Sequence, residues 1–274
     1  MLSRKKRFDK IVSDIKKIKI QGASNVAKAA LEAYSLFPNK KTRDILLKSR
    51  PTEPMVDHVL SLAEKHQNKE VLKHFDQTQE KINKLVFSLI KKDKVILTHC
   101  HSTNVLKSLI NAHKKRKNFE VYATETRPLY QGRKTANDLR KAGIKVTMFV
   151  DSSLGIALSQ KQGFKRVNKV LLGADALLRE GIINKVGSEL VARIAQEEKV
   201  PFYIVADSWK FTKKKVSIEQ RNLNEVWNKA PKNIKIRNPT FEFVDKKYIK
   251  GIITELGFMT YDMFIKRINK KYKF

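Results

Sequence analysis

Cysteine is nearly absent from this chain, since it occurs once among 274 residues, as Cys100. A single thiol excludes an intrachain disulfide and is typical of proteins in a reducing compartment, so we expect a cytoplasmic location. Glycine and proline are scarce, with 10 and 7 residues, and no apolar run approaches the roughly 18–20 residues of a membrane span. Disulfide-bonded, disordered and membrane-spanning classes are therefore excluded, and a globular fold with no membrane partner is predicted.

Acidic residues are under-represented, with 27 against 58 basic residues and a net charge of +31. Such a charge suits a phosphorylated ligand, nucleic acid or an acidic membrane surface. Most of the basic residues are Lys and are scattered along the chain, whereas specific contacts with bases and phosphates favour Arg. Two interpretations remain: a solvated lysine surface, or weak, non-specific and salt-sensitive binding of nucleic acid.

The spacing of apolar residues changes near residue 90. Residues 1–90 show helical spacing interrupted by prolines, whereas later residues alternate between short β-rich runs and amphipathic helical patterns. The expected strands are 95–98, 119–124, 145–150, 168–172, 202–206 and 251–254, and the expected helices are 103–116, 133–142, 152–161 and 186–198. This order predicts an α/β protein: an N-terminal helical domain (1–90), then a Rossmann-like domain (91–274) whose parallel sheet has helices on both faces. Residues 211–240 are expected to be rich in loops.

Candidate catalytic residues follow two of these strands. Right-handed crossovers place every strand's carboxyl end at one edge of the sheet, where Cys100 and Asp175 would then lie. The flanking His99 and His101 and a helix N-terminus predict a lowered pKa for the thiol, which favours a thiolate base or nucleophile. A buried structural thiol is one alternative. A His-Cys-His metal site is another, but no second ligand pair at zinc spacing is present, so no metal is expected.

Asp175 has two interpretations of its own, a catalytic acid or a solvated turn carboxylate. In a dry cleft its pKa would be raised, as an acid requires.

Candidate ligand-binding residues lie in three further segments. Arg127 and Arg133 have side chains suited to phosphate, and Glu125 could accept hydroxyl hydrogens, although an Arg–Glu structural network is the alternative. Residues 181–187 are expected to form a loop that opens a helix, with Asn184 and Lys185 at a phosphate cradle. Residues 21–24 precede a helix and are expected to bind phosphate in the same way.

Several motifs together resemble one family. They are Thr98-His99-Cys100-His101-Ser102, Thr124-Glu125-Thr126-Arg127-Pro128 with Gln131-Gly132, Gly173-Ala174-Asp175, Ile183-Asn184-Lys185-Val186-Gly187 and Ser208-Trp209-Lys210-Phe211, with weaker matches at Gln21-Gly22-Ala23 and Arg50-Pro51-Thr52. The chain resembles the superfamily that contains methylthioribose-1-phosphate isomerase, archaeal ribose-1,5-bisphosphate isomerase and the alpha, beta and delta subunits of initiation factor 2B. The Trp209-Lys210-Phe211 segment looks closer to the ribose-1,5-bisphosphate enzyme.

The resemblance implies an isomerase that converts ribose 1,5-bisphosphate to ribulose 1,5-bisphosphate in nucleotide salvage, with Cys100 as base and Asp175 as acid. It implies no cofactor and a homodimer or higher homo-oligomer. The implied substrate-binding residues are Gly22, Ala23, Arg50, Ser102, Thr103, Asn104, Glu125, Arg127, Gln131, Asn184, Lys185 and Lys210.

One departure from the family pattern keeps a second function open. Related isomerases commonly carry Arg where this chain has Gln21, so a presumed phosphate site lacks that cation. The alternative is a non-catalytic subunit that binds a sugar phosphate or nucleotide and docks on an initiation factor.

Overall fold

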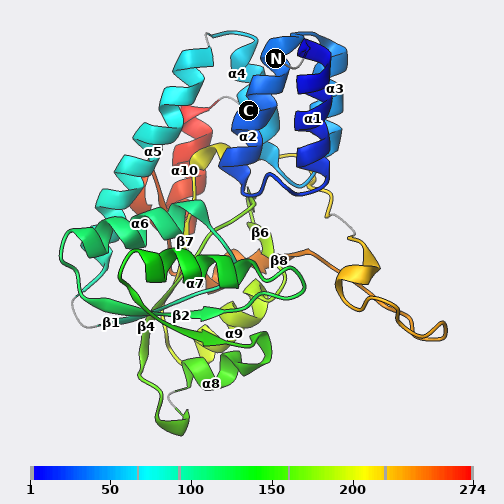
Figure 1. Ribbon diagram of the computed structural model, residues 1–274. Coiled ribbons are helices and arrows are strands. Elements are labelled where there is room, and N and C mark those ends of the chain that lie inside the picture. Colours follow the sequence, from blue (N-terminus) through cyan, green and yellow to red (C-terminus); the bar gives the residue numbers. More distant parts are fainter. Residues whose placement is uncertain (1–2, 67, 92–93, 160, 219–220, 273–274) are drawn as a thin grey trace.

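Helices precede the sheet in the computed structural model, which describes residues 3–66, 68–91, 94–159, 161–218 and 221–272. Figure 1 shows α1 to α4 packed together at one end of the molecule, with α5 running from them to the sheet. The bounds of these helices are α1 (Arg4–Lys16), α2 (Ala23–Leu36), α3 (Lys40–Ser49), α4 (Pro54–Ala63) and α5 (Asn68–Leu89).

The main sheet has the strand order β10-β9-β7-β4-β1-β2-β3. All neighbouring strands in it pair parallel except β10, which is antiparallel to β9. The bounds are β1 (Lys94–Thr98), β2 (Phe119–Thr124), β3 (Lys145–Phe149), β4 (Val167–Leu172), β7 (Phe202–Val205), β9 (Gly251–Thr254) and β10 (Gly257–Met259). The predicted α/β class and its six parallel strands are therefore confirmed.

Helices cover both faces of this sheet because its strands are apolar on both sides. Ile96 lies in the cluster formed with α5, α6 and α7, whereas Val95 and Leu97 lie in the cluster formed with α8, α9 and α10. This alternation is the period of two expected of a strand buried on both faces. The covering helices are α6 (Thr103–Lys114), α7 (Gln131–Lys141), α8 (Leu154–Leu158), α9 (Ser188–Glu197) and α10 (Tyr261–Lys271).

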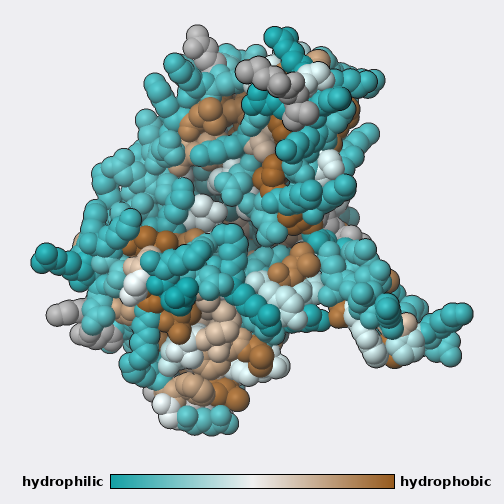
Figure 2. Space-filling view, in the orientation of Figure 1, coloured by the Kyte–Doolittle hydropathy of each residue, from teal (hydrophilic) through white to brown (hydrophobic). Residues whose placement is uncertain are grey.

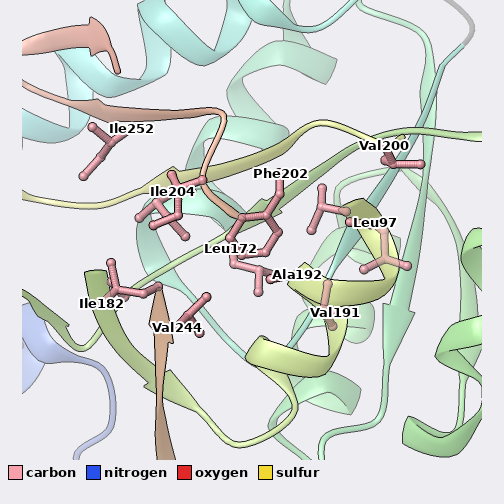
Figure 3. Packing of buried hydrophobic residues seen from close by; sticks show 14 of the residues in the cluster. Leu97, Leu172, Ile182, Val191, Ala192, Val200, Phe202, Ile204, Val244 and Ile252 are labelled. Carbon is pink, nitrogen blue, oxygen red and sulfur yellow. The ribbon is translucent and has the colours of Figure 1, made fainter. Parts of the chain in front are cut away.

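A second, antiparallel sheet was not expected from the sequence. It consists of β5 (Ala176–Leu177), β6 (Gly181–Lys185) and β8 (Phe241–Asp245), in that order. The prediction of a loop over 181–187 is therefore wrong for residues 181–185, which pair with β8. Because β8 is remote in sequence, no local pattern reveals this pairing. Figure 3 shows Ile182 and Val244 of the small sheet in the same packed group as Leu172 and Phe202 of the main sheet, so one core serves both.

Smaller differences concern element bounds. The helix expected over 152–161 is only Leu154–Leu158, after a 3₁₀ turn at Asp151–Ser153, and residue 160 lies outside the described residues. The segment 211–240 is mostly irregular as expected, and part of it extends away from the body (orange, Figure 1).

The predicted division into two domains near residue 90 stays a prediction. Residues 92–93 are not described, and α5 contributes to a helical cluster through Phe75 and to the sheet through Ile82.

A ring stack joins the helices to the sheet edge. His74 of α5 lies parallel to Trp209 of the 3₁₀ turn η3 (Ser208–Lys210), with ring centroids 3.3 Å apart. The Nε2 atom of His74 lies 3.0 Å from Oδ1 of Asp207, the residue that caps this turn. Trp209 also packs with apolar residues of α2, α4 and α5. The turn that follows β7 is therefore fixed from the helical side.

The visible surface is largely hydrophilic (Figure 2), as the abundance of Lys leads one to expect. None of the helices in the described ranges combines the length and the apolar character needed to cross a bilayer.

Gly132 and Gly155 offer a matched test of packing at α7. A Cβ atom at Gly132 would lie 1.7 Å from the Thr124 carbonyl oxygen, whereas one at Gly155 in α8 would meet no atom within 4 Å. We expect Gly132→Ala to lower the free energy of unfolding by about 1–3 kcal/mol or more, because α7 must shift from β2. Gly155→Ala should raise it by about 0.4–1 kcal/mol. Urea denaturation measures both, and equal effects would contradict this packing.

Candidate active site

A cavity of about 800 Å³, part of it open to solvent, lies where the carboxyl ends of β1 and β4 meet the helical layer. Such an edge is the usual ligand site of a parallel sheet. The structure brings most of the predicted site residues to its wall. They are Gly22, Ala23, Arg50, Cys100, Ser102, Thr103, Asn104, Gln131, Asp175, Asn184, Lys185 and Lys210.

Two predicted residues do not line the cavity. The carboxylate of Glu125 accepts a hydrogen bond of 2.7 Å from Arg133 Nη2. The guanidinium of Arg127 is exposed and donates to the Tyr130 hydroxyl and to the Val226 carbonyl. The Arg–Glu network left open as the alternative is thus present, and both side chains are engaged outside the cavity.

Cys100 stands at a sharp bend between β1 and α6. Its φ is +67°, in the left-handed region, and its amide donates to Thr126 Oγ1 at 2.9 Å. The Ser102 side chain caps α6 and packs so closely on Gly173 that a Cβ there would lie 2.5 Å from its hydroxyl. These contacts join the ends of β1 and β4 and hold the thiol at the cavity.

The two flanking histidines are engaged away from the thiol. His99 donates from Nε2 to the Val186 carbonyl at 2.9 Å, and its Nδ1 lies 2.5 Å from Thr124 Oγ1. His101 Nδ1 lies 2.9 Å from Thr135 Oγ1, whose proton goes to the Cys100 carbonyl. Burial lowers the pKa of His99 and lowers that of His101 to about 4. Neither ring supplies a cation to the sulfur at neutral pH.

The predicted low pKa of the thiol is therefore wrong. Burial raises the pKa of Cys100 to about 11, while the ammonium of Lys185 acts in the opposite direction and Asp175 raises the pKa further. The flanking histidines suggested a lowered pKa, but neither is charged at neutral pH, and desolvation of the thiol raises its pKa instead.

Asp175 behaves as predicted for a carboxyl in a dry cleft. Burial raises its pKa, opposed by the positive charges of Lys210, Lys185 and Arg50. A proton is thereby retained at higher pH than in a solvated carboxyl, which is the property of a general acid.

Three cationic side chains, those of Lys210, Lys185 and Arg50, are close enough to Asp175 to act on the pKa of its carboxyl. Lys210 donates from Nζ to the Ala174 carbonyl at 2.6 Å, directly before Asp175 in the chain. The Nζ atom of Lys185 lies 4.8 Å from the ring centroid of Phe241. The Nη2 atom of Arg50 lies 3.5 Å from Oε1 of Glu53, and both side chains of this ion pair are buried. This end of the cavity can bind an anion such as phosphate.

Helix N-termini form another anion-binding wall. Gly22, with φ +85°, precedes α2, and a Cβ on it would lie 3.5 Å from Thr103 Oγ1 at the start of α6. The starts of both helices are thus close together, which favours phosphate. Gln21 contributes no charge here, and its side-chain amide donates to the Ile18 carbonyl at 3.0 Å.

Two buried polar atoms at the wall have no hydrogen-bond partner within the described ranges: Gln131 Oε1 and Thr240 Oγ1. Buried polar groups are normally paired, so these two are suited to a polar ligand. Sequence reasoning missed Thr240, as well as Arg221 and Glu53, which also line the cavity. Thr240 and Arg221 come from the segment predicted only as loop, where no local pattern marks them.

Comparisons with known proteins agree with this architecture. The model of the Initiation factor 2 subunit family matches residues 17–261. A Methanocaldococcus jannaschii protein named ribose 1,5-bisphosphate isomerase is 35% identical over 89% of this chain and 88% of its own length. A protein of the same name from Archaeoglobus fulgidus is 33% identical, over 89% and 86%.

Among solved structures, the Pyrococcus horikoshii OT3 translation initiation factor eIF-2B superposes with a TM-score of 0.81 at 28% identity, covering 93% of this chain and 97% of its own. The neighbour therefore shares the fold of this chain over nearly its whole length. The chain belongs to the Initiation factor 2 subunit family. The family resemblance stated from the sequence is thereby confirmed.

The raised pKa of Cys100 can be measured directly because it is the only thiol. We expect alkylation by iodoacetamide to be slow at pH 7–8 and to accelerate with pH toward an inflection near 11, since the thiolate is the reactive form. Mass spectrometry of the time course gives the rate, and the guanidinium-unfolded protein is the control. An inflection below about 8.5, the value of a free thiol, would contradict the effect of burial.

Proposed function

We propose that this protein is a sugar-phosphate isomerase that converts ribose 1,5-bisphosphate to ribulose 1,5-bisphosphate. The observation that carries the proposal is one cavity that holds a thiol and a carboxyl with interacting charges, together with two walls suited to phosphate. The names of relatives at 33–35% identity support the same substrate.

The chemistry requires one acid and one base. The phosphate on the anomeric oxygen prevents a free aldehyde from forming, so the ring opens only when the ring oxygen receives a proton. Asp175 donates that proton, and Cys100 removes the proton from C2. The resulting enol phosphate takes a proton at C1 from Cys100, while the C2 hydroxyl returns its proton to Asp175 and becomes the ketone. Each proton-transfer group contributes about 10²–10⁴-fold to the rate.

The two pKa shifts determine which protonation state works. The pKa of Cys100 is raised to about 11, and that of Asp175 is raised above its ordinary value of 3.8. Between the two pKa values the pair carries one proton, predominantly on the thiol. The active form is the minor arrangement, with the proton on Asp175 and the charge on Cys100. The ammonium of Lys185 stabilises the thiolate of this arrangement, and it stabilises the Asp175 carboxylate of the other arrangement as well.

Substrate binding divides between the two walls. Lys210, Lys185 and Arg50 bind one phosphate near Asp175, and the starts of α2 and α6 bind the other through Gly22, Ala23 and residues 102–104. Gln131 and Asn184 bind sugar hydroxyls. Nucleotide salvage in the cytoplasm and assembly as a homo-oligomer complete the proposal, and no step requires a cofactor.

A second candidate is a binding subunit without turnover. The likeness to the Pyrococcus horikoshii initiation factor structure and the uncharged Gln21 favour it. In that case the cavity recognises a sugar phosphate, and the protein docks on an initiation factor.

Turnover of purified protein with ribose 1,5-bisphosphate tests the proposal. Phosphorus NMR should show ribulose 1,5-bisphosphate, and both Cys100→Ser and Asp175→Asn should reduce the rate by about 10²–10⁴-fold while retaining binding. Exposed Lys145→Ala, outside the cavity, is the control with unchanged rate. Saturable binding without any product would favour the binding-subunit function instead.

Solvent exchange assigns the two roles. Ribulose 1,5-bisphosphate is already open, so the exchange of its C1 proton in D₂O needs the base more than the ring-opening acid. Asp175→Asn should therefore reduce exchange less than it reduces ribose formation, which needs Asp175 a second time at the ring oxygen, whereas Cys100→Ser should lose both. The reverse pattern would exchange the roles of the two residues.

The pH dependence of kcat/KM should be a broad plateau. On the acid side, activity falls when the pair takes up a second proton and both groups become neutral. On the alkaline side, it falls near pH 11, when the pair loses its remaining proton. Steady-state kinetics across pH 5–11.5 measures this profile. An alkaline limb near pH 8 would show that Cys100 is not the group that titrates.

A further inference from the structure

Arg221 reaches the cavity from the irregular segment between η3 and β8. It lines the cavity together with Ile18 and Gln21. It also borders a neighbouring hollow beside Ser49 and Pro51. Arg221 therefore lies between the loop that precedes α2 and the loop that follows α3.

The guanidinium of Arg221 is held in place by a carboxylate. Its side chain is 13% exposed, and its Nε and Nη2 atoms both donate to Glu225, with Nε 3.2 Å from Oε2. Asn238 Nδ2 donates to the same Oε2 atom at 3.2 Å. A bidentate pair of this kind fixes the plane of the guanidinium. Within the described ranges the guanidinium makes its hydrogen bonds through Nε and Nη2, so Nη1 is left for a ligand.

The other cations at the wall belong to a separate group. Lys185, Lys210 and Arg50 all act on the pKa of Asp175, so they gather at its end of the cavity. The amide of Gln21 is turned to the Ile18 carbonyl and carries no charge. Among the lining residues that the structure describes, Arg221 is the cation that stands apart from the Asp175 group.

We propose that Arg221 is a specificity residue that binds the substrate's second phosphate, the one away from Lys185 and Lys210, and so selects a bisphosphate over monophosphates. This inference rests on the proposed isomerase function. Glu225 orients the guanidinium through Nε and Nη2, and Nη1 donates to the phosphate. Arginine suits this role because its planar donors match phosphate oxygens.

Isothermal titration of the full chain with three ligands tests the proposal: ribose 1,5-bisphosphate, ribose 1-phosphate and ribose 5-phosphate. Arg221→Ala should weaken binding of the bisphosphate and of one monophosphate by about 10–100-fold, the usual effect of losing a charged hydrogen bond. The other monophosphate should change by less than about twofold. Arg237→Ala removes an exposed arginine from the same segment and should change none of the three.

Two further variants separate charge from local structure. Glu225→Ala breaks the same ion pair but keeps the cation, so it should retain most of the bisphosphate affinity that Arg221→Ala loses. Gln21→Arg, added to Arg221→Ala, should restore part of the affinity, because both positions line the same wall. Equal losses in Glu225→Ala and Arg221→Ala, or equal weakening of all three ligands, would show a structural role and overturn the proposal.

Turnover distinguishes this inference from the function on which it rests. Wild-type turnover with unchanged affinity in Arg221→Ala overturns the specificity role and leaves the isomerase intact. Selective loss of affinity without wild-type turnover supports the role of Arg221 in a binding protein. Failure of the wild type to bind any of the three ligands overturns the inference.

Discussion

The parallel register of the central strands is the constraint on which the site depends. β1 lies between β2 and β4, with Ile96 opposite Val121 and Leu97 opposite Val170, so the chain leaves these strands at one edge. Cys100 and Asp175 follow β1 and β4 and therefore meet although they are distant in sequence. The small sheet then adds Lys185 to the same edge through β6. Pairing of the backbone thus decides which side chains can react together.

Desolvation is the second determinant, and it acts on both reactive groups in the same direction. Burial raises the pKa of the thiol and of the carboxyl, so each retains its proton to higher pH than in water. The ammonium groups of Lys185 and Lys210 and the guanidinium of Arg50 offset part of the desolvation that raises the pKa of Asp175, and Lys185 does the same for Cys100.

The sequence predicts what is local and misses what is tertiary. The alternation of strands and helices is encoded in short windows, so the fold class and the positions of Cys100 and Asp175 followed from it. The pairing of β6 with β8 joins remote segments and was not visible. The pKa of Cys100 was predicted with the wrong sign because the burial of the thiol is set by tertiary packing. The flanking histidines are also engaged elsewhere, with Thr124 and Thr135. Arg221 carries no local signal, since an arginine in an irregular segment is usually solvated.

The stack of His74 on Trp209 connects α5 of the helical layer to the turn that follows β7 at the sheet edge. Lys210 is the next residue after Trp209, and its ammonium is bonded to the carbonyl that precedes Asp175. α5 is therefore connected, through two stacked rings and the backbone of η3, to the ammonium beside the acid. The position of Lys210 at the cavity is thus supported by α5, a helix that contributes no residue to the cavity wall. Sequence changes along α5 can thus tune the chemistry without altering any residue that a ligand touches.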